Sequence, residues 1–108
     1  MHPATNHPAT DKEGYLRDRS RWSPAVAEWL AERESITLTP EHWALIELVR
    51  AFYAKHEVSP AMRPLVKLAR EQLGESCGNS LYLLKLFPGS PAKLLAKIAG
   101  LPRPTNCL

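Results

Sequence analysis

A cysteine stands one residue before the end of this chain, at position 107. Two prolines, Pro102 and Pro104, precede it in a segment with few side chains that could bury a thiol. Because structural cysteines are usually buried, an accessible thiol on an extended tail favours a chemical role. The stretch from Gly100 to Cys107 would span roughly 20–25 Å when extended, compared with a domain radius of gyration of ~13 Å. The pattern predicts a thiol that an arm carries into the active site of another protein.

The environment of this thiol does little to activate it. With an ordinary thiol pKa of ~8.5, only a few per cent of Cys107 would be thiolate at neutral pH. Arg103 and Lys97 favour the thiolate weakly, whereas the terminal carboxylate opposes it. We therefore expect activation inside the pocket of a partner. Cys77 falls in a polar loop and is interpreted as an incidental thiol, although a disulfide between it and Cys107 stays open.

Other kinds of chemical site find little support. The four histidines lack metal-site spacing, since His42 and His56 stand far apart and His2 and His7 open the chain. No pair of His or Cys residues has the i, i+4 or Cys-x-x-Cys spacing of a zinc site. No glycine-rich phosphate loop and no Ser-His-Asp order is present. We expect neither a bound metal nor a cofactor.

The elements that must position the arm are marked by prolines that follow a hydroxyl residue. These pairs are Ser23-Pro24, Thr39-Pro40, Ser59-Pro60 and Ser90-Pro91. A Ser or Thr N-cap accepts hydrogen bonds from unpaired amides, and Pro at the first helical position loses none. The expected helices cover 24–33, 40–55, 60–73, 80–87 and 91–99. The second of them is apolar around most of its surface and should be the most buried. The sequence therefore predicts an all-α domain with at most a small β element.

Composition divides the chain into three parts: 1–10, 11–100 and 101–108. The first part repeats His-Pro-Ala-Thr and is interpreted as disordered or tag-like. The second is the helical domain, and the third is a flexible arm, because two prolines in four residues forbid a helix there. Apolar runs are far shorter than the ~20 residues that cross a bilayer, and no apolar leader opens the chain. We expect a cytoplasmic protein without a membrane partner.

Positive charge is concentrated late in the chain. Residues 58–108 carry seven Lys or Arg against two acidic residues. Three of them, Arg63, Lys67 and Arg70, share one side of the expected helix 60–73. This side could face solvent or the phosphates of a nucleic acid. Since a short link joins this helix to the preceding one, a helix-turn-helix DNA-binding regulator is one open interpretation.

Six motifs follow one another in a fixed order between Asp11 and Leu108. They are Glu13-Gly14-Tyr15-Leu16, Thr39-Pro40-Glu41-His42-Trp43, Ser59-Pro60-Ala61-Met62-Arg63, Gly78-Asn79-Ser80, Leu86-Phe87-Pro88-Gly89 and the run from Lys97 to Thr105. Together they resemble the DsrC/TusE family of sulfur-relay proteins, and Cys107 falls where that family places its penultimate cysteine. The resemblance implies a small orthogonal helical bundle with a β-hairpin and a mobile C-terminal arm, and a persulfide carried on Cys107. Because Pro3 and Pro8 cannot donate strand hydrogen bonds, we expect the hairpin to be incomplete.

Position 96 distinguishes two branches of that family. DsrC proteins use a second arm cysteine upstream of the penultimate one, and this sequence has Ala96 there. The single-cysteine pattern resembles the TusE-like branch, which implies a sulfurtransferase that receives sulfur from a TusBCD-type donor complex. It also implies delivery to an MnmA-type enzyme that 2-thiolates the wobble uridine of tRNA. Arg103 and Lys97 would then dock the arm against an acidic partner surface or tRNA phosphates. A single-cysteine carrier in sulfur oxidation stays open, and we expect a monomer that docks transiently.

Overall fold

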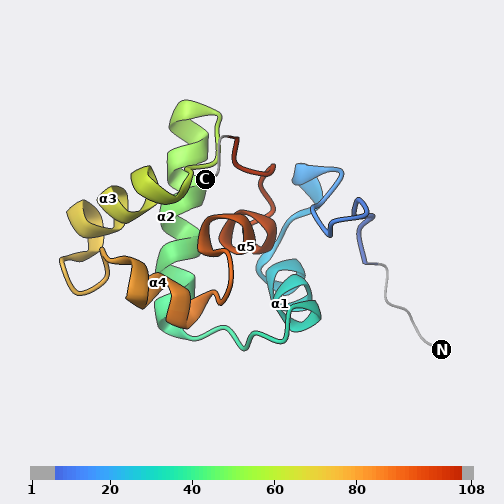
Figure 1. Cartoon of the computed structure of the whole chain (residues 1–108). Helices are drawn as coiled ribbons and strands as arrows, with labels where there is room; N and C mark the ends of the chain where they lie inside the picture. Colours follow the sequence, from blue (N-terminus) through green and yellow to red (C-terminus); the bar gives the residue numbers. More distant parts are fainter. Residues whose placement is uncertain (1–6, 106–108) are drawn as a thin grey trace.

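Five α-helices joined by short loops make up the fold in the computed structural model, which describes residues 7–105 (Figure 1). They are α1 (Pro24–Arg33), α2 (Pro40–His56), α3 (Met62–Leu73), α4 (Ser80–Leu86) and α5 (Pro91–Ile98), preceded by a short 3-10 helix, η1 (Arg19–Arg21). The prediction of a mainly helical fold is confirmed. In this part of the chain, no helix combines the length and the apolar character needed to cross a membrane.

Three of the hydroxyl–proline pairs begin helices as predicted. Ser90 is the N-cap of α5 and Pro91 its first residue, without a side-chain cap hydrogen bond, whereas Ser23 and Thr39 cap with their hydroxyls. The Ser23 hydroxyl accepts a hydrogen bond from the amide of Val26 (3.2 Å), and Pro24 is the first residue of α1. Thr39 caps α2 in the same way, with Pro40 in the first turn. Each hydroxyl cap satisfies an amide that the first helical turn would otherwise leave without a partner.

The pair Ser59-Pro60 does not begin a helix, so the prediction for the start of α3 is wrong. The N-cap of α3 is Ala61, which makes no side-chain cap hydrogen bond, and the helix starts at Met62. A helix from Pro60 would need an amide hydrogen at Pro64, which proline lacks. Starting at Met62 places Pro64 in the first turn, where the amide needs no helical partner.

The most buried helix is α5, and the expectation that the 40–55 segment would be is also wrong. Five of the eight residues of α5 are buried, compared with four of the 17 in α2. This helix packs against each of the other four and lies in the middle of them in Figure 1. The small side chains of Ala92 and Ala96 let neighbouring helices approach it closely. Short length and small residues therefore allow α5 to be surrounded.

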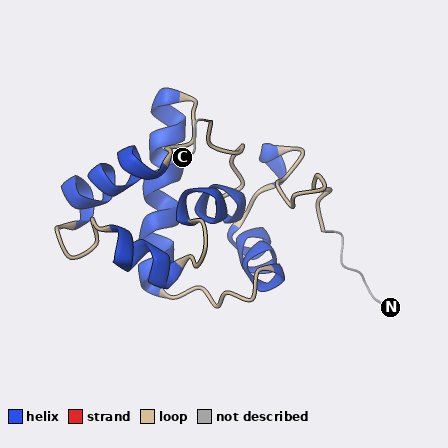
Figure 2. Cartoon of the chain, in the orientation of Figure 1, coloured by secondary structure: helices blue, strands red, loops and turns tan. Residues whose placement is uncertain are grey.

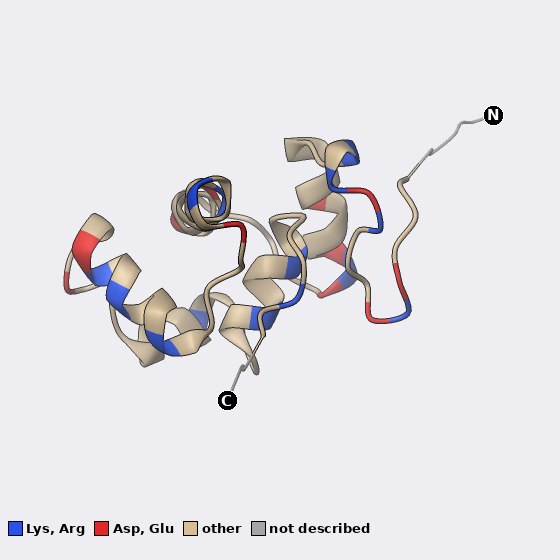
Figure 3. Cartoon of the chain, turned by 90° about the horizontal axis from the view of Figure 1, so that it is seen from above, with Lys and Arg blue, Asp and Glu red and all other residues tan. Residues whose placement is uncertain are grey.

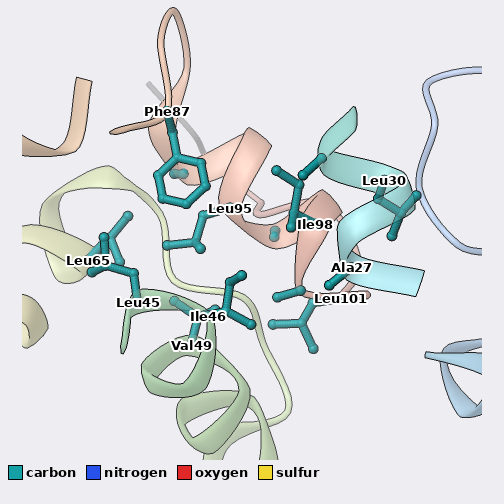
Figure 4. Close-up of a cluster of buried hydrophobic side chains, with 14 of the residues drawn as sticks. Ala27, Leu30, Leu45, Ile46, Val49, Leu65, Phe87, Leu95, Ile98 and Leu101 are labelled. Atoms are coloured by element: carbon teal, nitrogen blue, oxygen red, sulfur yellow. The ribbon is translucent and has the colours of Figure 1, made fainter. Parts of the chain in front are cut away.

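The hydrophobic core forms around α5 (Figure 4). On one side, Ile98 meets Ala27 and Leu30 of α1, and on the other, Leu95 faces α2 and α3. Burial of each Leu or Ile side chain contributes about 1.5–3 kcal/mol. Leu101, which follows α5, is also buried in this cluster. The C-terminal arm thus begins from the core itself.

The segment before η1 contains no β-strand within the described residues, and Figure 2 accordingly draws none. An isolated antiparallel bridge joins Thr10 to Leu16. The amide of Asp11 donates to the carbonyl of Tyr15 (2.8 Å), which closes the turn between them. The predicted hairpin is therefore reduced here to a single bridge, and Pro3 lies outside the described residues.

Candidate functional site at the base of the C-terminal arm

The C-terminal arm leaves α5 through a tight reversal at Gly100. The amide of Leu101 donates to the carbonyl of Ala96 (2.9 Å), and the amide of Gly100 donates to that of Lys97 (3.1 Å). This pair of hydrogen bonds is a Schellman motif, which needs a left-handed residue at the position of Gly100. Its φ of 74° lies in the region that glycine adopts without strain. The first residue of the arm is thereby fixed in direction as well as in position.

Trp22 and Arg50 support the same reversal from the side. The indole N–H of Trp22 donates to the carbonyl of Ile98 (2.9 Å), and the guanidinium of Arg50 donates to that of Ala99 (2.8 Å). The guanidinium carbon lies 3.7 Å from the centroid of the Trp22 ring, a cation–π contact. Burial lowers the pKa of Arg50 from its ordinary value. Two carbonyls at the end of α5 are satisfied by these side chains.

Beyond the reversal, the arm is tied down at two further residues. The Ser59 hydroxyl donates to the carbonyl of Pro102 (2.5 Å). Arg103 forms an ion pair with Glu13, and its guanidinium carbon lies 5.2 Å from the centroid of the Tyr15 ring. The arm is therefore anchored as far as Arg103. The link between α2 and α3, which contains Ser59, holds it on one side, and the N-terminal turn (residues 11–15) holds it on the other.

The predicted nucleophile, Cys107, lies outside the described residues. The described chain ends at Thr105, whose side chain is exposed, two residues before Cys107. The chemical role of Cys107 and the flexibility of 101–108 stay predictions. The structure adds that the base of the arm has a defined path.

The two predicted docking residues differ in their surroundings. Lys97 Nζ lies 3.0 Å from Glu34 Oε2, and the Lys97 side chain is 15% exposed. It also lies 5.4 Å from the centroid of the Tyr15 ring, so it joins α5 to the end of α1 and to the N-terminal turn. The Arg103 side chain is 48% exposed and accessible from solvent. A docking role for either residue stays a prediction. Arg103 is more accessible to a partner than Lys97, because its side chain is more exposed.

Arg63, Lys67 and Arg70 are exposed along α3, where Figure 3 shows the basic positions. Arg70 also donates to the carbonyl of Gly78 (3.1 Å) and so closes the loop that follows α3. α2 and α3 pack against each other, as a helix-turn-helix would require. Contact of these three residues with a nucleic acid stays a prediction.

Comparison with known families places the whole arrangement in context. The family described as DsrC like protein matches residues 4–108. The chain belongs to the DsrC-like family. Among curated relatives, sulfurtransferase TusE of Escherichia coli K12 is 52% identical over 99 residues, which cover 92% of this chain and 91% of the relative. Sulfurtransferase TusE of Pectobacterium atrosepticum is 53% identical over 100 residues, which cover 93% and 92%.

Solved structures of the DsrC-like family share this fold. The NMR structure of Allochromatium vinosum DsrC has a TM-score of 0.83 at 44% identity, covering 91% of this chain and 88% of that one. The crystal structure of the oxidized gamma-subunit of the dissimilatory sulfite reductase (DsrC) from Archaeoglobus fulgidus has a TM-score of 0.82 at 40% identity. That alignment covers 94% of this chain and 92% of the other.

The second cysteine of this DsrC-like protein has a local partner. Cys77 lies between α3 and α4, is partly exposed and forms no disulfide within the described residues. The Cys77 side chain lies close enough to the Tyr82 hydroxyl to raise the pKa of that phenol. This contact agrees with the interpretation of Cys77 as a local, incidental thiol. The alternative disulfide involves Cys107 and therefore lies outside the described residues.

We expect the Tyr82 phenol to ionise near pH 12. Burial disfavours the phenolate, and Cys77 and the charge of Glu41 add to this effect, which raises the pKa of Tyr82 to about 12. An unfolded tyrosine ionises near pH ~10, so the folded chain keeps a proton that the unfolded chain loses. The stabilising contribution is complete below pH ~10 and disappears as pH rises through about 12. Phenolate absorbance during a pH titration measures the ionisation, and Tyr82→Phe shows which transition belongs to Tyr82. A Tyr82 transition near pH ~10 would contradict the expectation.

His42 serves to cap α2. The amide of Thr39 donates to Nδ1 of His42 (3.1 Å), so Nε2 carries the proton and donates to the carbonyl of Leu86 (2.9 Å). The ring also meets the edge of Phe87 at 5.0 Å between centroids. Both ring nitrogens are thereby used in the fold. Within residues 7–105, no group of three or more His, Cys, Asp or Glu residues could hold a metal ion.

The residues that anchor the arm of this DsrC-like protein were not found by sequence reasoning. Arg50 offered one signal, because it is a cation on a helix segment that is otherwise mostly apolar. Ser59 was assigned to a helix cap that does not form. Trp22 lies outside every expected helix. All three act on carbonyls of residues 98–102, far away in the sequence, where local periodicity gives no information.

Proposed function

We propose that this chain is a sulfur carrier that accepts persulfide sulfur on Cys107 and passes it to the next protein of a relay. The observation that carries the proposal is the identity of 52% with sulfurtransferase TusE over more than nine-tenths of both chains. Cys107 is the residue we assign to the transfer, since it stands at the penultimate position that characterises the family. The described structure supports this assignment by anchoring the arm up to Arg103.

The proposed transfer is a thiol–persulfide exchange. The Cys107 thiolate attacks the outer sulfur of a donor persulfide, R–S–S–H. A new S–S bond forms on Cys107 as the donor S–S bond breaks, and R–S⁻ leaves. One persulfide is consumed and one is formed, so the step needs no external oxidant or reductant. The same exchange in the next protein returns Cys107 to the thiolate.

The position of Ala96 supports a carrier with one arm thiol. Ala96 is 2% exposed within α5, and its carbonyl accepts the hydrogen bond of the Schellman motif. The chain therefore has no upstream arm thiol with which Cys107 could form an intra-arm disulfide. A nearby thiol would also release the carried sulfur as sulfide, so its absence suits transfer between proteins.

We assign the partners from the TusE-like resemblance. The donor would be a TusBCD-type complex, and the acceptor an MnmA-type enzyme that 2-thiolates tRNA wobble uridine. The carrier would be a cytoplasmic monomer that uses no cofactor, and Arg103 would help to dock its arm. Lys97 would act through the internal ion pair with Glu34, which fixes the end of α5 from which the arm departs.

Reconstitution of the relay tests this function. The chain would be incubated with cysteine, a cysteine desulfurase and the TusBCD-type complex, and its intact mass recorded. We expect a gain of one sulfur atom that reductant reverses and that peptide mapping assigns to Cys107. Addition of the MnmA-type enzyme, tRNA and ATP, which activates the uridine oxygen as a leaving group, should then remove the sulfur and yield 2-thiouridine. A loaded carrier that never transfers to tRNA would refute the assigned acceptor, and sulfur on Cys77 would refute the assigned thiol.

A further inference from the structure

A groove between α2 and α3 leads away from the end of the described arm. It consists of two adjoining hollows of about 750 and 440 Å³, which share Phe52 and Pro64. Thr105 lines the larger hollow. Ser59, whose hydroxyl holds the arm, lines it too. We call these joined hollows the α2–α3 groove, and it begins where the described arm ends.

The floor of the α2–α3 groove is apolar. Its apolar lining includes Leu48, Phe52, Val58, Met62 and Leu68. The Val58 side chain is 51% exposed, so a partner in the groove could contact it directly. Phosphate groups gain nothing from contact with such side chains. The floor therefore favours a protein partner over a nucleic acid.

The rim of the α2–α3 groove is mainly basic. Lys55, Arg63 and Lys67 line it as cations, whereas Glu71 is the acidic residue among its lining side chains. The three cations are exposed. A rim of this sign attracts an acidic partner and speeds its association. The apolar floor and basic rim together match an amphipathic segment with acidic flanks.

We propose that the α2–α3 groove binds an acidic amphipathic helix on a protein that exchanges sulfur with Cys107. This proposal rests on the proposed carrier function. From Met62 to Glu71, α3 extends for about 14 Å, which is enough to align a partner helix of two to three turns. Chain connectivity keeps the Cα atom of Cys107 within about 7 Å of that of Thr105. A partner seated in the groove is thereby held beside the thiol.

The test compares two loading reactions on the same variants of the full chain. In the first, the TusBCD-type complex supplies the persulfide, and in the second a small molecule, cysteine persulfide, does. Val58→Glu places a charge on the apolar floor, and the pair Lys55→Glu with Lys67→Glu reverses the rim. Leu81→Glu is the matched control, because Leu81 is 81% exposed on α4 and lines neither hollow. Delivery of sulfur to the MnmA-type enzyme is measured for each variant as well.

We expect Val58→Glu and the double rim reversal to lower kcat/KM for at least one of the two protein-to-protein transfers by about tenfold or more. The effect of the rim reversal should shrink as salt concentration rises, because the charges are exposed. Loading from cysteine persulfide should change by less than about twofold in every variant, since it uses Cys107 and not the groove. The Leu81→Glu control should behave as the unaltered chain does in all three reactions.

Several results would overturn the inference. Normal transfer with both proteins in Val58→Glu would show that the floor binds neither. Faster loading of Val58→Glu by cysteine persulfide would show that the C-terminal residues of this chain occupy the groove. A loss confined to the rim reversal and to the reaction with tRNA would point to a nucleic acid instead. Failure of the unaltered chain to load from either persulfide would refute the carrier function itself, which separates the two proposals.

Discussion

Cys107→Ser is expected to abolish persulfide loading, with no detectable sulfur adduct where the unaltered chain is fully loaded. A serine hydroxyl has no accessible anion at neutral pH and forms no persulfide, so the loss should exceed a thousandfold in rate. Intact mass spectrometry after incubation with cysteine persulfide measures it. Circular dichroism of the variant, compared with that of the unaltered chain, checks that the loss of loading does not come from unfolding.

Cys77→Ser is the matched control for this prediction. Serine keeps a hydrogen-bonding group beside Tyr82, so the loop between α3 and α4 should retain its structure. This variant should load one sulfur atom at the rate of the unaltered chain. Residual loading of Cys107→Ser that disappears in the double variant would assign the carrier role to Cys77 and contradict our assignment.

Gly100→Ala is expected to destabilise the fold by about 3 kcal/mol. A non-glycine residue at a φ of 74° is strained, which costs roughly 1 kcal/mol. The added Cβ would also lie 2.3 Å from Cδ1 of Trp22. Because Trp22 then has to move, its hydrogen bond to Ile98 and its contact with Arg50 are disturbed, at a further cost of about 2 kcal/mol. Urea denaturation measures the total.

Gly89→Ala separates the backbone strain of a positive φ from the steric clash with Trp22. Gly89 has a φ of 89°, but a Cβ there would meet no atom within 4 Å. The Gly89→Ala variant should therefore lose only about 1 kcal/mol of unfolding free energy, from backbone strain. Equal losses in the two variants would contradict the role of Trp22 at the arm base. Loading of the Gly100→Ala variant by cysteine persulfide should persist at a temperature where it stays folded, because the thiol is untouched.

Helix positions were predictable where a local signal decides them. Ser23 and Thr39 cap their helices because cap, proline and apolar run are contiguous. Ser59 carries the same signal, yet Pro64 shifts the helix start, and its hydroxyl binds Pro102 instead. Local patterns therefore identify candidate starts, but a second proline within the first turns decides between them.

The arrangement around the arm could not be predicted from local patterns. The pairing of Lys97 with Glu34 and that of Arg50 with the carbonyl of Ala99 each join residues distant in sequence. The helical pattern of a sequence does not distinguish an exposed lysine from an ion-paired lysine. It therefore gives no sign that Lys97 pairs with Glu34. The central position of α5 was missed for a related reason, since periodicity reports which face is apolar and not how many helices surround it. The arm cysteine, in contrast, was evident from its position in the chain.

The anchored base of the arm has a kinetic consequence. Only three residues separate the ion-paired Arg103 from Cys107, which limits the reach of the thiol from that point to about 14 Å. Once the helical body rests on another protein, the thiol samples a small volume, and its effective concentration there is millimolar or higher. Sulfur transfer then becomes an intramolecular reaction that needs no tight association. A short tether lets the protein bind weakly and leave quickly while still completing the exchange during one brief encounter.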